Sequence, residues 1–191
     1  MTNKISNPIY SELLKLKLIK KKNIIKISNK TRDKNVKVYR DKLSKIIFLE
    51  KAFSHSVNHY NDKFSDMDRV KKKSQVVELS KKKINLAILD DELRRYLKFR
   101  KIIKNKKILD FGCGWGSFLL KAKDAKSRFG IELRKECKNY IRSLDKSIFV
   151  KTSLNEIRTK FDVIMSFHTL EHIPNQVEIL KKLKNKLKVD G

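Results

Sequence analysis

Three glycines alternate with other residues in the segment ILDFGCGWG, which spans residues 108–116. The whole chain holds only five glycines, so this concentration indicates a special demand on the backbone. An apolar run precedes the glycines and SFLLKAKDA follows them, a pattern that predicts a buried strand, a turn and a helix. Because glycine lacks a Cβ atom, such a turn can be sharp and its backbone can lie directly against a ligand.

Strand-like and helix-like segments alternate through the second half of the chain. This alternation predicts an α/β fold with a doubly wound, mostly parallel sheet that carries helices on both faces. Ligands bind such a sheet beyond the carboxyl ends of its strands, where the glycine turn follows the first strand. The expected strands are 106–111, 127–132, 147–150 and 161–167, and the expected helices are 116–125, 134–144 and 174–187, the last with Pro174 in its first turn.

The sequence before the expected sheet has a different character. Residues 1–83 are rich in lysine, and the runs VKVYR and IIFLE predict a β-hairpin within residues 36–50. We therefore divide the chain into a basic N-terminal extension of helical and hairpin structure, residues 1–83, and a second part, residues 84–191. A helix is expected from about Asp90, with Asp90 or Asp91 as its N-cap and with Leu93, Tyr96, Leu97 and Arg100 on one face.

The formal net charge of +27 suggests a nucleic acid or an anionic membrane as a partner. Lysine far outnumbers arginine, however, and a coding bias toward adenine and thymine produces the same composition. We therefore favour a solvated basic surface, and binding of a nucleic acid by the N-terminal extension is the alternative.

The cysteines and the apolar segments indicate the cellular compartment in which the protein is expected. Cys113 and Cys137 are too few and too far apart for a disulfide framework or a zinc ribbon, and they suit a reducing environment. No apolar run approaches the roughly 20 residues that span a bilayer. Lysines interrupt the N-terminal segment where a signal peptide would need an apolar stretch. The sequence thus predicts a cytoplasmic protein without a membrane span, and it does not indicate an oligomeric state.

Two carboxylates accompany the glycine turn. Asp110 gives the spacing D-x-G-x-G-x-G, which departs from the dinucleotide-binding G-x-G-x-x-G because Ser117 stands at the last position. Asp110 can receive an ammonium group, and the free amides of the helix near Gly116 can receive a carboxylate. Glu132 ends the second strand, where it can accept both hydrogen bonds of a ribose diol. Together these groups describe an amino acid joined to a nucleoside.

The segments LDFGCGWG, GIE, FDVIMSFHTLEHI and LKVDG resemble the class I S-adenosylmethionine-dependent methyltransferases, and among them bacterial enzymes that act on small molecules. The resemblance covers roughly residues 90–191. It implies S-adenosylmethionine as the cofactor and a Rossmann-like sheet of seven strands in the order 3-2-1-4-5-7-6. The sequence stops at the turn that leads into the fifth strand. We therefore expect a truncated domain in which strands 1–4 are present and strands 5–7 are missing.

The resemblance also implies which residues hold the cofactor. Where the family usually offers an acidic residue to the adenine amino group, this chain has a serine, which forms weaker hydrogen bonds. The implied residues are Asp110, Gly112, Gly114 and Gly116 at the methionine part, Glu132 at the ribose, Leu133 near the adenine, Ser153 at the adenine amino group with Leu154 beside it, and Phe167 and His168 where the site closes after the fourth strand.

Residues 168–172 spell H-x-x-E-H, which is also a zinc-binding motif. The segment follows a strand-like run and precedes Pro174 instead of lying on a long helix, so we expect no metal there. His168 is the candidate general base because a histidine can take a proton near neutral pH. A structural role for His168 is the alternative that we favour.

Three functional hypotheses follow. The first is S-adenosylmethionine-dependent methyl transfer to a small-molecule substrate, a metabolite or a sugar-type acceptor. The second is an RNA methyltransferase that holds its substrate with the basic N-terminal region. The third is a truncated remnant that binds the cofactor without turning it over.

Overall fold

The computed structural model describes residues 5–31, 34–52 and 84–191, with side chains in the last range from residue 93 onward. The chain divides into two compact units. One holds Met1–Ser54 and Leu170–Lys181, and the other holds His55–Thr169 and Lys182–Gly191. The boundary expected between residues 83 and 84 lies at the edge of the range 53–83, outside the described residues, and it stays a prediction.

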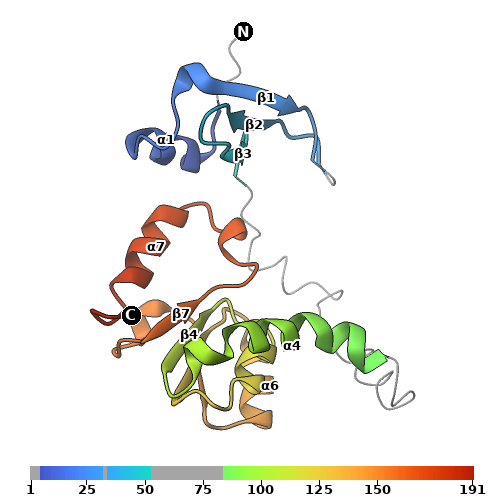
Figure 1. The fold of residues 1–191 in the computed structure, drawn as a ribbon, viewed down its shortest axis with the longest axis vertical. Helices are drawn as coiled ribbons and strands as arrows, with labels where there is room; N and C mark the ends of the chain where they lie inside the picture. Colours follow the sequence, from blue (N-terminus) through green and yellow to red (C-terminus); the bar gives the residue numbers. More distant parts are fainter. Residues whose placement is uncertain (1–4, 32–33, 53–83) are drawn as a thin grey trace. The chain divides into compact units, whose positions relative to one another are not determined.

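A small antiparallel sheet forms the centre of the first unit (Figure 1). Its strands β1 (Ile24–Ser28), β2 (Val38–Asp41) and β3 (Ile47–Leu49) lie in the order β1-β2-β3. The pair β2 and β3 is antiparallel and lies where the sequence predicts a hairpin. Strand β1 was not expected, because its residues IIKIS belong to a stretch whose frequent lysines obscure any periodicity.

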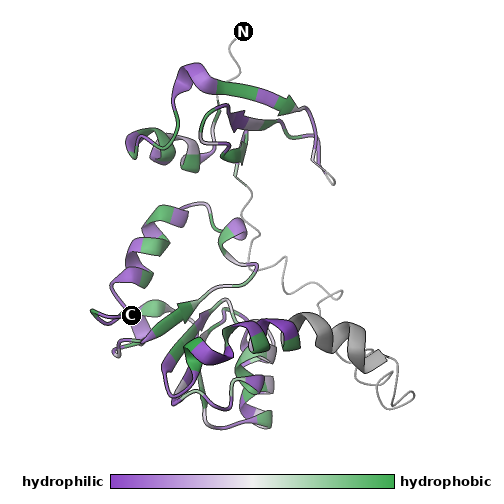
Figure 2. Cartoon of the chain, viewed as in Figure 1, coloured by the Kyte–Doolittle hydropathy of each residue, from purple (hydrophilic) through white to green (hydrophobic). Residues whose placement is uncertain are grey.

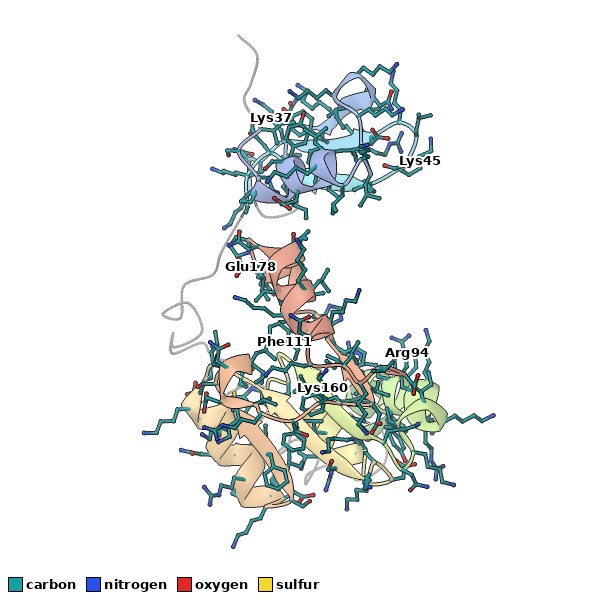
Figure 3. All side chains as sticks on the ribbon, turned by 90° about the vertical axis from the view of Figure 1, so that its left-hand side faces the viewer. Lys37, Lys45, Arg94, Phe111, Lys160 and Glu178 are labelled. Atoms are coloured by element: carbon teal, nitrogen blue, oxygen red, sulfur yellow. The ribbon has the colours of Figure 1, made fainter. Side chains whose placement is uncertain are left out.

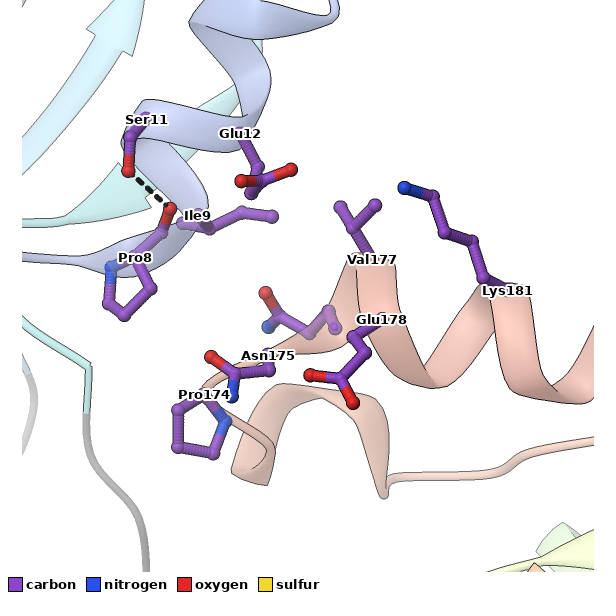
Figure 4. A pocket seen from close by; sticks show the side chains of 10 residues that line it. Pro8, Ile9, Ser11, Glu12, Pro174, Asn175, Val177, Glu178 and Lys181 are labelled. Atoms are coloured by element: carbon purple, nitrogen blue, oxygen red, sulfur yellow. Dashed lines mark hydrogen bonds between the residues drawn. The ribbon is translucent and has the colours of Figure 1, made fainter.

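Helix α1 (Pro8–Lys15) begins where the sequence supplies a cap. Oδ1 of Asn7 accepts a hydrogen bond from the backbone nitrogen of Ile9 (3.1 Å), and Pro8 follows at a position that needs no donor. The hydroxyl of Ser11 donates to the carbonyl oxygen of Pro8 at 3.0 Å, as Figure 4 shows. The 3-10 turn η1 (Lys21–Asn23) then leads into β1. The hydrophobic core cluster of this unit includes Leu13, Ile19, Tyr39 and Phe48.

The second unit contains the parallel sheet that the sequence predicts. Strands β4 (Lys107–Phe111), β5 (Ser127–Ile131), β6 (Ile148–Lys151) and β7 (Val163–Met165) lie in the order β6-β5-β4-β7. In order along the chain this is 3-2-1-4, the arrangement that the resemblance implies for the first four strands. Figure 1 shows β4 and β7 side by side, in agreement with their register. All four strands therefore end at one edge of the sheet.

Helices pack on this sheet and confirm the α/β fold. Helix α4 (Ile84–Ile103) packs on α5 (Ser117–Lys121), and α6 (Lys135–Leu144) packs on β6. The 3-10 turn η2 (Leu154–Glu156) follows β6, while η3 (Leu170–His172) and α7 (Gln176–Lys184) follow β7. The short strand β7 is hydrophobic along its length (Figure 2). The buried core of the unit includes Ile103, Ile108, Phe118, Leu119, Ile141 and Val150.

The predicted start of α4 was wrong. The helix begins at Ile84, so Asp90 and Asp91 lie inside it and do not cap it. The predicted face was also wrong in part, because Leu93 and Leu97 are exposed. Among the side chains of α4 that the structure describes, from residue 93 onward, Tyr96, Phe99 and Ile103 contact the core.

Two other helices are shorter than predicted. Helix α5 ends at Lys121 because the following turn folds back on α4, where the carboxylate of Asp124 accepts hydrogen bonds from the Tyr96 hydroxyl (3.2 Å) and from Nε of Arg100 (2.9 Å). Helix α7 begins at Gln176, so Pro174 precedes it instead of lying in its first turn.

Basic side chains extend outward from both units. Figure 3 shows their nitrogen tips at the surface, and Lys37 is paired there with Glu50 at 3.2 Å. Within the described ranges, none of the helices combines the length and the hydrophobicity that a membrane crossing requires.

Candidate functional site

The loop between β4 and α5 carries the three alternating glycines. Gly112, Gly114 and Gly116 have φ angles of +82°, +52° and +74°, which residues with a Cβ atom rarely adopt. The backbone nitrogens of Gly112 and Cys113 donate to the carbonyl oxygen of Ile131 at 2.9 and 3.0 Å. These bonds fix the loop to the end of β5, so the sharp turn predicted from the sequence lies at the carboxyl edge of the sheet.

The three glycines meet different surroundings. A Cβ atom on Gly112 would overlap the side chain of Thr169, and one on Gly116 would lie 2.6 Å from Cγ1 of Ile141. These two glycines therefore let the loop pack closely against its neighbours. At Gly114 the nearest atom would be Nη2 of Arg134, at 3.7 Å, which is an ordinary contact distance. Of the three glycines, Gly114 is thus the one whose Cβ position the surrounding protein crowds least.

Asp110 lies at the carboxyl end of β4 with only 3% of its surface exposed. Its Oδ1 atom is buried and receives no hydrogen bond from the described residues. Burial raises the pKa of this carboxyl to about 7, and the charge of Glu132 adds to the rise while that of Arg95 opposes it. A buried carboxyl with an unsatisfied oxygen is suited to receive an ammonium group from a ligand.

Glu132 follows β5 and forms a tight pair with Arg134. Its Oε1 atom accepts hydrogen bonds from the backbone nitrogen of Arg134 (3.0 Å) and from Nε of the same residue (3.2 Å). The guanidinium of Arg134 lies 5.5 Å from the ring centre of Trp115, which in turn packs edge-on against Tyr140. Trp115 is therefore held by packing, and its Nε1 is buried and unpaired within the described residues.

The segment after β6 is ordered by a capping box. Oγ of Ser153 accepts from the backbone nitrogen of Asn155 (3.2 Å), and Oε1 of Glu156 accepts from the backbone nitrogen of Ser153 (3.0 Å). The serine hydroxyl can still donate a hydrogen bond to a ligand. Leu154 is 7% exposed and belongs to the core, whereas Leu133, the other apolar candidate, is 61% exposed beside Glu132.

Phe167 and His168 lie in the turn after β7. The ring of Phe167 packs against Phe99 and Phe118, at 5.8 and 5.2 Å between ring centres, and the guanidinium of Arg95 lies 5.3 Å above it. Phe167 thus supports the wall of the site from the core. His168 is exposed and has a φ of +53°, a left-handed conformation that is uncommon outside glycine.

The sheet brings Asp110, Gly112, Gly114 and Glu132 to one edge, because β4 and β5 are parallel and in register. Sequence reasoning missed Arg95 and Arg134, the two cations near these carboxylates. For Arg134 a signal existed, because a residue two positions after an acidic side chain often donates its backbone N–H to it. For Arg95 the sequence gave no signal, since its relation to Asp110 arises only when α4 packs on the sheet.

A family model described as a methyltransferase domain matches residues 82–191, whereas no curated protein matches. The solved structures that the chain resembles include coclaurine N-methyltransferase in complex with N-methylheliamine and SAH, with 23% identity and a TM-score of 0.47 over 56% of this chain and 34% of that one. The plantazolicin methyltransferase BpumL has 22% identity and a TM-score of 0.46 over 65% of this chain and 51% of that one.

A third solved structure is an S-adenosylmethionine-dependent methyltransferase from Mesorhizobium loti, with 20% identity and a TM-score of 0.43 over 49% of this chain and 48% of that one. The chain spans about half the length of the first structures that it matches. The family model, by contrast, matches more than half of the present chain. The chain therefore belongs to the methyltransferase domain family, the S-adenosylmethionine-dependent class I methyltransferases that its sequence resembles.

Proposed function

We propose that the chain binds S-adenosylmethionine at the carboxyl ends of β4 and β5 and transfers its methyl group to a small metabolite or a sugar-type acceptor. One observation carries the proposal: the buried Oδ1 of Asp110 is unpaired within the described residues and lies on the strand that leads into the open glycine loop. Buried polar atoms are normally hydrogen-bonded, so an unpaired one at a ligand-binding edge indicates the place of a ligand group.

The residues present fit this cofactor. Asp110 would receive its ammonium group, and Gly114 would let the methionine part lie against the loop. Glu132 would accept hydrogen bonds from the ribose hydroxyls. The exposed Leu133 would pack on the adenine, and Ser153 would donate to its edge. The remaining candidates would support the site without contacting the cofactor. Gly112 and Gly116 shape the loop, and Leu154 and Phe167 lie in or against the core.

When bound, S-adenosylmethionine supplies a methyl group on a sulfonium, which is activated for in-line displacement. The chain's own residues then have to hold the ligand in one orientation and keep its polar groups paired. Proximity and alignment of this kind account for about 7–11 kcal/mol of a barrier in favourable cases. A general base is required only when the acceptor must lose a proton. His168 is the proposed base for that case, since its exposed side chain is accessible to an acceptor.

RNA as the acceptor is the second candidate, and the net charge of +27 favours it. Basic residues that neutralise phosphates release counterions, so the affinity for RNA would fall steeply as salt rises. Methyl transfer to a neutral small molecule would be nearly independent of salt. Transfer assays with labelled cofactor at low and high salt, on RNA and on a panel of small acceptors, therefore separate the two candidates. Cofactor binding without transfer to any acceptor would favour the non-catalytic alternative.

Isothermal titration with S-adenosylhomocysteine, the demethylated product, tests the binding step of the proposal. We expect saturable binding with one ligand per chain. Absence of binding by a folded chain would contradict the proposed function.

Replacing Glu132 with alanine is expected to weaken S-adenosylhomocysteine binding by about 1.5–3 kcal/mol, the range for hydrogen bonds to a charged group. The reason is that the carboxylate is the proposed acceptor for the ribose hydroxyls. Titration with the 2′,3′-dideoxy analogue provides the control, because a ligand without these hydroxyls should be nearly indifferent to the change. Equal losses for both ligands would show that Glu132 acts through the fold instead.

A further inference from the structure

The side chain of Arg134 is as buried as the carboxylate that it holds. The exposed fractions are 10% for the side chain of Arg134 and 11% for that of Glu132. Ion pairs at this depth are costly to break, because removing one partner leaves the other charge poorly solvated. The pair therefore fixes the orientation of Glu132 far more firmly than a surface ion pair would.

Both hydrogen bonds of this pair end on the same oxygen. The backbone nitrogen and Nε of Arg134 donate to Oε1 of Glu132, at 3.0 and 3.2 Å. The described residues donate no hydrogen bond to Oε2, the other oxygen of this carboxylate. One oxygen is thus committed to the protein, and the other is available for a ligand.

Arg134 also connects the carboxylate to the glycine loop. Its guanidinium lies 5.5 Å from the ring centre of Trp115, and its Nη2 atom would be 3.7 Å from a Cβ atom on Gly114. Trp115 is held in turn by the edge-on contact with Tyr140 of α6. One side chain therefore spans the ends of β4 and β5, the two places that would hold opposite parts of the cofactor.

We propose that Arg134 is a positioning residue: it holds Oε1 of Glu132 and so directs Oε2 to the ribose hydroxyls, while its packing on Trp115 sets the distance between that carboxylate and the glycine loop. The inference rests on the proposed function, because it assigns a role in binding the same cofactor. Arg134 itself need not touch the ligand, since its effect passes through Glu132.

Titration with S-adenosylhomocysteine and with its 2′,3′-dideoxy analogue tests this role. We expect Arg134→Ala to weaken binding of S-adenosylhomocysteine at least tenfold and to leave binding of the dideoxy analogue nearly unchanged. Arg134→Lys should recover part of the loss, because an ammonium can reach Oε1 but cannot reproduce the planar packing on Trp115. Arg142→Ala is the matched control, because it removes an exposed arginine from α6, the helix that directly follows Arg134, and should change neither affinity.

A double-mutant comparison separates positioning from a general structural role. In the Glu132→Ala background, Arg134→Ala should have no further effect on S-adenosylhomocysteine binding, since the group that it positions is gone. Equal losses for both ligands, or additive losses in the double variant, would overturn the inference. If the unaltered chain binds neither ligand, the proposed function fails and the inference fails with it. If Glu132→Ala alone weakens binding and Arg134→Ala does not, only the inference fails.

Discussion

Replacing Gly114 with asparagine is expected to abolish measurable S-adenosylhomocysteine binding while leaving the chain folded. Asparagine tolerates the left-handed conformation that Gly114 adopts at φ +52°, so the backbone strain is small. Its side chain would nevertheless occupy the space against the loop that the ligand needs. We expect an affinity loss on the order of 100-fold or more, equivalent to about 2.7 kcal/mol, in isothermal titration.

Substitutions at the two neighbouring glycines are the controls, because they should affect the stability of the chain, which Gly114→Asn should leave nearly unchanged. Gly112→Ala and Gly116→Ala should lower the thermal stability of the chain, because their Cβ atoms would overlap Thr169 and crowd Ile141. Gly114→Asn should melt close to the unaltered chain, since only Nη2 of Arg134 lies within ordinary contact distance of a Cβ atom there. Unchanged affinity in Gly114→Asn would place the ligand elsewhere.

The sheet could be predicted because its strands are short apolar runs that are separated by helical segments. KILDF and SRFGI became β4 and β5 with almost the expected bounds. Helix boundaries were less predictable, because tertiary contacts decide them. The early end of α5 depends on Asp124, whose partners Tyr96 and Arg100 precede it by more than twenty residues in the sequence.

The sequence identified the residues of the candidate site, but it did not show which of them pack against the protein and which are exposed. The spacing in the sequence does not distinguish the three glycines from one another. The positions of Thr169 and Ile141 in the structure show that two of the glycines allow close packing of the loop. In the same way, periodicity could not show that Leu154 belongs to the core while Leu133 is exposed, because this depends on how η2 follows β6. Contacts between residues distant in sequence carry this information.

The ligand-free chain is expected to lose stability as the pH rises from about 4 to about 7, because deprotonation of Asp110 is unfavourable inside the fold. Burial raises the pKa of this carboxyl from an ordinary value of 3.8 to about 7, so the folded chain holds the proton more tightly than the unfolded chain. Its contribution to stability is therefore fully present below pH 3.8 and is lost as the pH rises through 7. Between about pH 4 and pH 8 the loss is on the order of 4 kcal/mol, from roughly three pKa units.

The variant Asp110→Asn removes this titration and separates the stability of the chain from its binding. The difference in free energy of unfolding between Asp110→Asn and the unaltered chain, from urea titrations, should grow in favour of the variant by about that amount from pH 4 to pH 8. Asp190→Asn, which removes an exposed carboxylate, should show no such growth. A difference that stays constant with pH would mean that the Asp110 carboxyl titrates alike in both states.

Binding should respond in the opposite direction, because an ammonium group beside Asp110 favours the charged carboxylate. The affinity of the unaltered chain for S-adenosylhomocysteine should rise as the pH increases through about 7, with release of a proton on binding. Asp110→Asn should bind weakly and show little of this pH dependence. Titrations in buffers of different ionisation enthalpy measure the released proton. A stabilised variant that binds as well as the unaltered chain would show that the buried carboxyl does not meet the ligand, and the ammonium would then have to be placed beside another group.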